Sequence, residues 1–169
     1  YADPLAMSAV VVTKDGYVLL QERSAISGEY PGMLHVTPSG HLQPPASLAD
    51  GVLAELHEEL AVQPEELDGE LKVIALVLNT QIHKPELVLH GHMKVALGEL
   101  LARRPKDAWE YNQLLPLRWK AEAVKGWLVE HQHDAVPPGH AALLLAAAHE
   151  FKDPWFEERV PPLEPAGSP

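Results

Sequence analysis

The sequence contains no cysteine. This absence excludes disulfide bonds, thiolate zinc sites and cysteine nucleophiles, and it makes the cytoplasm the expected compartment. Aromatic residues are also scarce, at 6% of the chain, so aliphatic side chains must fill most of the core, for which the 46% hydrophobic content is ample. A core of this kind suits helices packed on a sheet.

Positive charge is in short supply as well. With 13 Lys and Arg against 24 Asp and Glu, the formal net charge is -11. A negative surface repels nucleic acids and anionic lipid headgroups, so we expect neither as a partner, and a polyanionic substrate would need a local positive charge such as a bound metal ion. No apolar run approaches the roughly 20 residues of a membrane span, so we expect no membrane association.

The length of 169 residues suits one domain. We predict a single domain over residues 1–159. The segment 160–169 contains four prolines, which predicts a flexible tail.

Short apolar runs rich in β-branched residues predict the strands of a sheet. These runs cover residues 7–13, 17–21, 33–36, 71–79, 87–97 and 114–119. The turn-forming segment 14–16 is expected to join the first two strands as a hairpin, and Lys84-Pro85 indicates a second hairpin. Apart from its short strand, the segment 24–40 holds two prolines and three glycines and is expected to be a loop of functional length.

Three segments have the pattern of helices. Ser47 can cap the first through Asp50, and its apolar residues recur at helical spacing up to about residue 61. The other two cover 121–132 and 141–151. The alanine-rich stretch 142–148 is expected to pack either against the sheet or against a second subunit in a homodimer. Together, the elements predict an α/β/α sandwich with a mixed sheet.

The first helix carries three glutamates, Glu55, Glu58 and Glu59, of which the first and third are stacked with Glu58 beside them. Like charges this close repel by about 0.2–0.5 kcal/mol per pair on an exposed helix, and a divalent cation would remove that cost. Oxygen ligands suit Mg²⁺ or Mn²⁺. Acidic clusters on solvated helices are common, so the context matters: upstream, Gly40 permits a tight bend and a close approach of backbone to ligand.

From Gly40 to Val62 the sequence resembles the Nudix hydrolases. Their motif runs Gly, five residues, Glu, seven residues, Arg-Glu, an aliphatic residue, any residue, Glu-Glu, any residue, Gly, aliphatic. Counted from Gly40 without insertion, the later matching positions are Glu55, Leu56, Glu58, Glu59 and Val62. Residues 9–23 look like the opening strands of that family, and residues 38–40 look like its Pro-Gly-Gly bend.

Three alanines depart from the motif. Ala46 replaces its first glutamate, Ala54 its arginine and Ala61 its last glycine. In this family the arginine is expected to orient the glutamates, so Ala54 bears on catalytic efficiency more than on metal binding.

The resemblance implies a Mg²⁺- or Mn²⁺-dependent hydrolase, a pyrophosphatase that splits the diphosphate bond of a nucleoside diphosphate linked to another moiety. The implied metal ligands are the Ser39 carbonyl, Glu55, Glu58 and Glu59. Either Glu55 or Glu59 would be the base that activates water.

Three more residues take roles under the resemblance. Glu110 lies where some family members place a distal glutamate, which implies a further metal ligand. Arg23 would hold a substrate phosphate, and Tyr111, like Tyr30 and Trp109, could stack on a base. The ordinary alternatives are a loop acid, a surface ion pair and aromatic side chains in the core or at a rim.

Other hypotheses stay open. The missing motif residues favour a non-catalytic Nudix module that binds a nucleotide or nucleotide sugar. An isomerase of prenyl diphosphates is disfavoured by the absence of cysteine, and a structural protein with an acidic helix would show no metal-dependent change in Tm. His83, His90 and His92 raise the question of a second metal site, but half-exposed strand histidines with ordinary hydrogen bonds are the interpretation we adopt.

Overall fold

The computed structural model describes residues 5–42 and 47–160 of the chain. Ala46 and all but the first residue of the predicted tail lie outside this part. Within it, no helix is long and apolar enough to cross a membrane.

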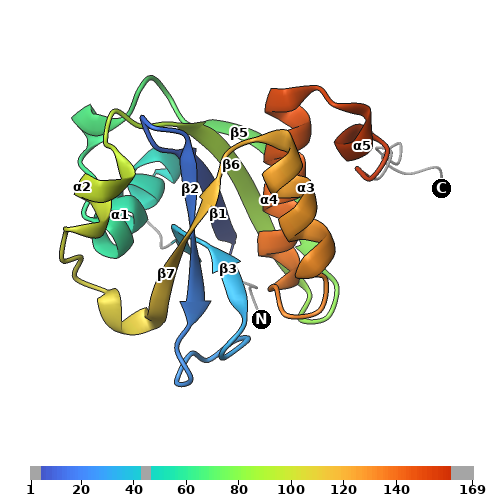
Figure 1. Ribbon diagram of the computed structural model, residues 1–169. Coiled ribbons are helices and arrows are strands. Elements are labelled where there is room, and N and C mark those ends of the chain that lie inside the picture. The colour runs from blue at the N-terminus through green and yellow to red at the C-terminus, as the bar shows by residue number, and fades with distance from the viewer. Residues whose placement is uncertain (1–4, 43–46, 161–169) are drawn as a thin grey trace.

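The described strands form two sheets (Figure 1). The first has the order β4-β1-β6-β5 and is mixed, because β1 is parallel to β6 and antiparallel to β4. The second, with the order β3-β2-β7, is antiparallel. The strands are β1 (Ala6–Val12), β2 (Tyr17–Arg23), β3 (Leu34–Val36), β4 (Ser39–His41), β5 (Lys72–Asn79), β6 (Lys84–His92) and β7 (Tyr111–Arg118).

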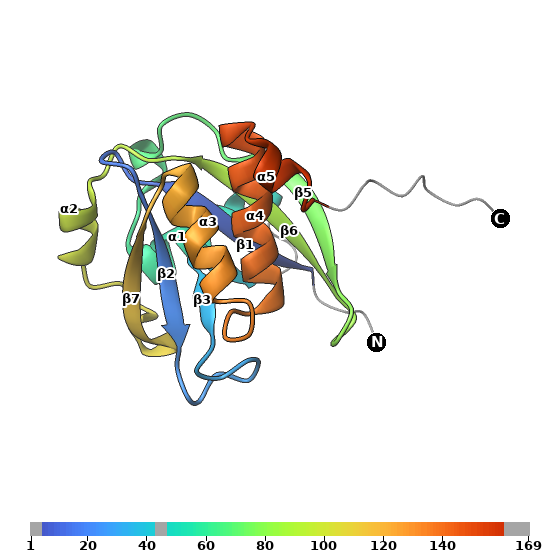
Figure 2. The same cartoon turned by 45° about the vertical axis from the view of Figure 1, so that its right-hand side comes forward.

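Helices cover the sheets from both sides (Figures 1 and 2). Helix α1 (Leu48–Leu60) packs on one side, and α3 (Ala121–Glu130) and α4 (Pro137–Phe151) pack on the other. This confirms the predicted α/β/α sandwich with a mixed sheet. The shorter helices are α2 (Leu97–Leu101), α5 (Pro154–Glu157) and the 3-10 helices η1 (Pro64–Glu66) and η2 (Ala108–Glu110).

Strand β1 supplies both halves of the core. Met7, Ala9 and Val11 pack in the cluster that includes α1, whereas Val10 and Val12 pack in the cluster that includes α3 and α4. Alternate residues of a strand point to opposite faces, so a strand covered on both faces needs an unbroken apolar run. This explains the unbroken apolar run at residues 9–12.

The structure shows what the alanine-rich helix packs against. Ala142, Leu143, Ala146 and Ala147 are buried in the core between α4 and the sheet, together with residues of β1, β2 and β6. The helix therefore packs against the sheet. A homodimer stays a prediction.

The predicted hairpin of β1 and β2 is wrong. The turn closes as expected, with the Thr13 amide donating to the Tyr17 carbonyl at 2.7 Å. However, β1 pairs with β4 and β6, whereas β2 pairs with β3 and β7, so the two strands belong to different sheets. The chain therefore passes into the second sheet after the turn.

The second predicted hairpin is present, but its turn is not at Lys84-Pro85. Strands β5 and β6 pair antiparallel, and both residues lie inside β6. Pro85 is tolerated there because the pairing of β6 with β1 begins only at Glu86, so no amide donor is required on that side. The strand ends at His92, and residue 97 begins α2 instead of ending a strand.

Candidate active site

Helix α1 is well specified by its ends. The Ser47 hydroxyl accepts from the Asp50 amide while the Asp50 side chain accepts from the Ser47 amide, which completes the predicted capping box. At the other end Ala61 adopts the left-handed conformation, with φ of 52°. Glycine takes this conformation most easily, which explains why the motif has a glycine at this position.

The glutamates of α1 differ in their exposure to solvent. Glu59 is 1% exposed. Its carboxylate accepts hydrogen bonds from the Thr37 hydroxyl at 2.6 Å and from the Ser39 amide at 3.2 Å. Burial raises the pKa of Glu59 to about 8, against the opposing effect of these two hydrogen bonds.

Glu55 is half-buried, and it lies directly over Gly40. A Cβ at residue 40 would come within 2.2 Å of the Glu55 Cδ. The glycine thus permits a close approach, and the group that approaches it is the Glu55 carboxylate of the protein itself. Burial, followed by the negative charges of Glu58 and Glu110, raises the pKa of Glu55 to about 7.

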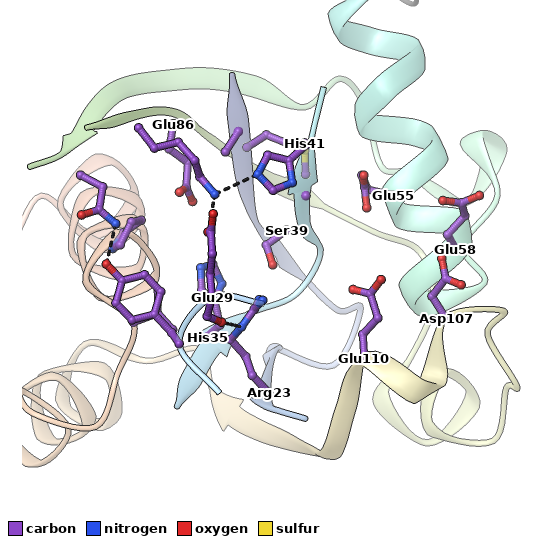
Figure 3. Close-up of a pocket in the computed structure, with 18 residues that line it drawn as sticks. Arg23, Glu29, His35, Ser39, His41, Glu55, Glu58, Glu86, Asp107 and Glu110 are labelled. Atoms are coloured by element: carbon purple, nitrogen blue, oxygen red, sulfur yellow. Dashed lines mark hydrogen bonds and ion pairs between the residues drawn. The ribbon is translucent and has the colours of Figure 1, made fainter. Parts of the chain in front are cut away.

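A loop from a distant part of the sequence adds the carboxylates of Asp107 and Glu110 to those of Glu55 and Glu58, and together they form an acidic wall. The Asp107 amide donates to the Glu58 carbonyl at 3.0 Å, so the loop is attached to the last turn of α1. Figure 3 shows Asp107 and Glu110 facing the glutamates of α1. Burial and the charge of Asp107 raise the pKa of Glu110. Lys106, the neighbouring residue, pairs with the Glu58 carboxylate at 2.7 Å.

The carboxylates of Glu55, Glu58, Asp107 and Glu110 lie at one end of a cleft of about 320 Å³, and two cationic side chains line its other end (Figure 3). Arg23 lines it, and its Nε donates to the Glu29 carbonyl at 2.9 Å. Lys84 is buried, pairs with the Glu29 carboxylate and lies 2.9 Å from His41 Nε2. The cleft therefore has an acidic end, lined only by carboxylates among its charged groups, and an end with two cations, Arg23 and Lys84, beside the carboxylates of Glu29 and Glu86, which we call the basic end.

The structure brings most of the predicted site residues together. Ser39, Glu55, Glu58, Glu110 and Arg23 all line the cleft. The remaining two, Glu59 and Tyr111, lie side by side in a separate hollow.

Of the other aromatic candidates, Tyr30 lines the cleft, and its hydroxyl accepts from the Asn79 amide at 2.9 Å. Trp109 is 60% exposed and lies outside the residues that line the cleft.

Several residues of the cleft were not predicted from the sequence. Asp107 carries no local signal beyond its position three residues before Glu110. The unpredicted residues at the basic end come from two separate segments of the chain, residues 29–41 and 84–86, and a buried lysine within β6 is not foreseeable from strand patterns. These residues are Glu29, His41, Lys84 and Glu86.

The chemistry of the acidic end suits a divalent cation. Its donors are carboxylate oxygens, and burial and mutual repulsion disfavour their ionised forms when no cation is bound. Carboxylates of this kind hold Mg²⁺ or Mn²⁺, and a partly hydrated ion leaves positions for phosphate oxygens. The arrangement can therefore receive a phosphate group between an acidic wall with a cation and a basic wall.

Comparison with known proteins supports one fold family. A family model described as the NUDIX domain matches residues 3–127. A search of curated proteins found no match to this sequence. Among solved structures, a mutT/nudix family protein from Listeria innocua is 16% identical, with a TM-score of 0.64, over 90% of this chain and 96% of that chain.

Two further structures were solved with ligands. The NUDIX domain of Shewanella oneidensis NrtR, complexed with ADP ribose, is 19% identical, with a TM-score of 0.60, over 90% of each chain. A bifunctional NMN adenylyltransferase/ADP ribose pyrophosphatase from Francisella tularensis, complexed with AMP and a manganese ion, is 13% identical, with a TM-score of 0.64. The match covers 89% of this chain but 42% of that one. At these identities the likeness shows a shared fold.

Proposed function

This chain belongs to the NUDIX family, and we propose that it is a metal-dependent hydrolase that cleaves the diphosphate bond of a nucleoside diphosphate linked to another moiety. The observation that carries the proposal is the cleft with carboxylates at one end and Arg23 and Lys84 at the other. The similar structures solved with ADP ribose or with AMP and manganese support a substrate of the nucleotide type. A cytoplasmic location, expected from the absence of cysteine, is part of the proposal.

The residues that would hold Mg²⁺ or Mn²⁺ are the Ser39 carbonyl, Glu55, Glu58, Glu59 and Glu110. When bound, the ion would neutralise charge on the phosphate oxygens. Glu58 and Glu110 enter the cleft from different segments, so they would hold the ion from two sides. Of these proposed ligands, Glu59 is the one that does not line the cleft, and its carboxylate accepts hydrogen bonds from the Thr37 hydroxyl and the Ser39 amide.

Glu55 is the better candidate for the general base. It lines the cleft, where the attacking water would lie, and in the metal-free protein burial raises its pKa to about 7. Glu59 does not line the cleft. In this proposal the Glu55 carboxylate accepts the proton of the water that attacks phosphorus.

The basic end would orient the substrate. Arg23 can donate to phosphate oxygens from its guanidinium nitrogens, and Lys84 adds a second positive charge within the same cleft. Tyr30 lines the same end and offers an aromatic face for a base. Tyr111, assigned as a substrate contact from the sequence, would contact substrate only at the Glu59 side.

A non-catalytic module that binds a nucleotide or nucleotide sugar is the second candidate. The observation that favours it is Ala54, which is exposed and leaves the neighbouring carboxylates without the orienting arginine of the motif. Under this hypothesis the cleft would bind the same class of ligand and release no product.

A product-release assay over a panel of nucleoside diphosphate compounds, with Mg²⁺, Mn²⁺ or chelator, distinguishes the two candidate functions. The proposal expects release that depends on metal. Glu55→Gln and Glu59→Gln should each lower turnover on the best substrate by at least about a hundredfold, since a lost base or ligand removes several kcal/mol of transition-state stabilisation.

The matched control is Glu65→Gln, which removes an exposed glutamate outside the cleft. Equal turnover in the three variants would show that the active site does not involve the glutamates of α1. Saturable binding of a panel compound without any release would favour the binding module.

A further inference from the structure

A second cluster of potential metal ligands lies away from the cleft. His90 and His92 are on β6, and Glu150 is in the last turn of α4. Their ligand atoms all lie within 4.8 Å of one another. The two histidines share a strand face, as their spacing predicts, but the carboxylate that meets them comes from the helix packed on the sheet.

The hydrogen bonds of His90 determine which of its nitrogens is available. Its Nδ1 lies 2.8 Å from the Val10 carbonyl. A carbonyl oxygen only accepts, so Nδ1 must carry the proton, and the neutral ring then has its lone pair on Nε2. That lone pair faces a Glu150 carboxylate oxygen at 2.6 Å.

Two acceptors at this distance need a positive charge between them. It can be a proton, which would make His90 an imidazolium, or a metal ion bound by both groups. His92 Nε2 approaches the same Glu150 oxygen at 3.2 Å, so a third donor converges on the same point. An ion pair of His90 and Glu150 does not require this third group.

We propose that His90, His92 and Glu150 form a second metal site that takes Zn²⁺. Imidazole nitrogens with one carboxylate are a ligand set that zinc accepts, whereas the all-oxygen acidic wall of the cleft suits Mg²⁺ or Mn²⁺. A tetrahedral ion with bonds of about 2.0–2.1 Å separates its ligand atoms by roughly 3.3 Å. The Glu150 oxygen would have to withdraw from His90 by less than an ångström.

The surroundings of the three ligands support this assignment. His90 is 6% exposed, and its Nδ1 contact with a backbone carbonyl is the kind of supporting bond that orients metal-bound histidines. His92 and Glu150 are more accessible, with 47% and 30% of their side chains exposed, so an ion can enter from solvent and keep a water as fourth ligand. Asp68 and Glu70 line the same hollow and add negative charge.

A bound ion would connect β6 to the C-terminal end of α4, which lies over the sheet (Figure 1). It would bind the folded state only, because the two strand residues are 58 or more positions from Glu150 in the sequence. Zinc should therefore raise the Tm of the protein by mass action.

The test is a titration of the full chain with Co²⁺, a zinc substitute with a visible absorption spectrum, after chelator treatment and in saturating Mg²⁺ to occupy the cleft. Wild type should show the intense bands of a tetrahedral cobalt site, and Zn²⁺ should displace them and raise Tm. His92→Ala and Glu150→Gln should each lower the affinity by at least about a hundredfold, more than the loss of a supporting contact causes.

The control is His133→Ala, which removes an exposed histidine elsewhere and should leave the titration unchanged. The double variant Glu55→Gln/Glu58→Gln should also keep the cobalt bands, because it alters only the cleft. Absence of tetrahedral bands in wild type, wild-type affinity in His92→Ala and Glu150→Gln, or loss of the bands in the cleft variant would overturn the proposal.

Discussion

Neutralising Glu59 should change how the stability of the metal-free protein depends on pH. Burial raises the pKa of this carboxyl from 4.5 to about 8. The folded state therefore holds the proton more tightly than the unfolded chain does. The resulting stabilisation is complete below pH 4.5 and is lost as pH rises from 4.5 to about 8.

The size of the effect follows from the shift. One pKa unit corresponds to about 1.4 kcal/mol, so a change from 4.5 to about 8 allows a loss of at most about 5 kcal/mol. Relaxation of the site reduces this figure, and we expect about 2–4 kcal/mol. Glu59→Gln should lack this loss, because its amide oxygen can accept from the Ser39 amide and its NH₂ can donate to the Thr37 hydroxyl.

The assay is urea unfolding of chelator-treated protein between pH 4.5 and pH 8. Wild type should lose stability across this range, and at the upper end Glu59→Gln should be the more stable protein. Glu55, whose pKa burial raises to about 7, adds a slope of the same sign to both proteins, so the difference between their profiles is dominated by Glu59. Mg²⁺ should restore stability to wild type more than to the variant.

Glu65→Gln is the control for removing one negative charge from the surface. It should follow the wild-type profile. If Glu59→Gln and Glu65→Gln gave parallel profiles, the reasoning about the buried carboxyl would be refuted.

Three other substitutions test the geometry around α1. Gly40→Ala places a Cβ within 2.2 Å of the Glu55 carboxyl, so metal affinity by calorimetry should fall at least about tenfold, while Tm changes little because a flexible side chain can move aside. Unchanged affinity would show that Glu55 is not held there. Ala54→Arg should preserve turnover or raise it, lowering the activation free energy by up to about 1 kcal/mol. The reason is that residue 54 is exposed and an arginine there can reach Glu58 one turn later. A loss of more than about 2 kcal/mol in unfolding free energy would contradict this placement. Ala61→Gly should stabilise the protein by about 0.5–1 kcal/mol in urea unfolding, because residue 61 has φ of 52°; a destabilised variant would mean that the alanine methyl contributes more by packing than its backbone conformation costs.

The sequence by itself was sufficient for the local structure around the site. Ser47 and Asp50 predicted the start of α1, and the spacing of its leucines predicted the face that enters the core. The match from Gly40 to Val62 predicted the fold family as well. The helix start and its apolar face depend on residues within one or two helical turns of each other, so their geometry follows from backbone periodicity, whereas the fold family followed from the resemblance alone.

Only the tertiary structure decided which distant groups meet. The attachment of Asp107 to Glu58, the contact of Lys84 with His41 and the meeting of Glu150 with His90 join residues 43 to 60 positions apart. Strand order likewise separated β1 from β2 despite a good turn between them, because β1 pairs with β4 and β6 while β2 pairs with β3 and β7. Such contacts depend on sheet order, register and the packing of helices on the sheet, and no local periodicity encodes these. The burial of Glu59 has the same origin, since the loop residue Thr37 covers a helix position that the helical pattern alone places at the boundary between the core and solvent.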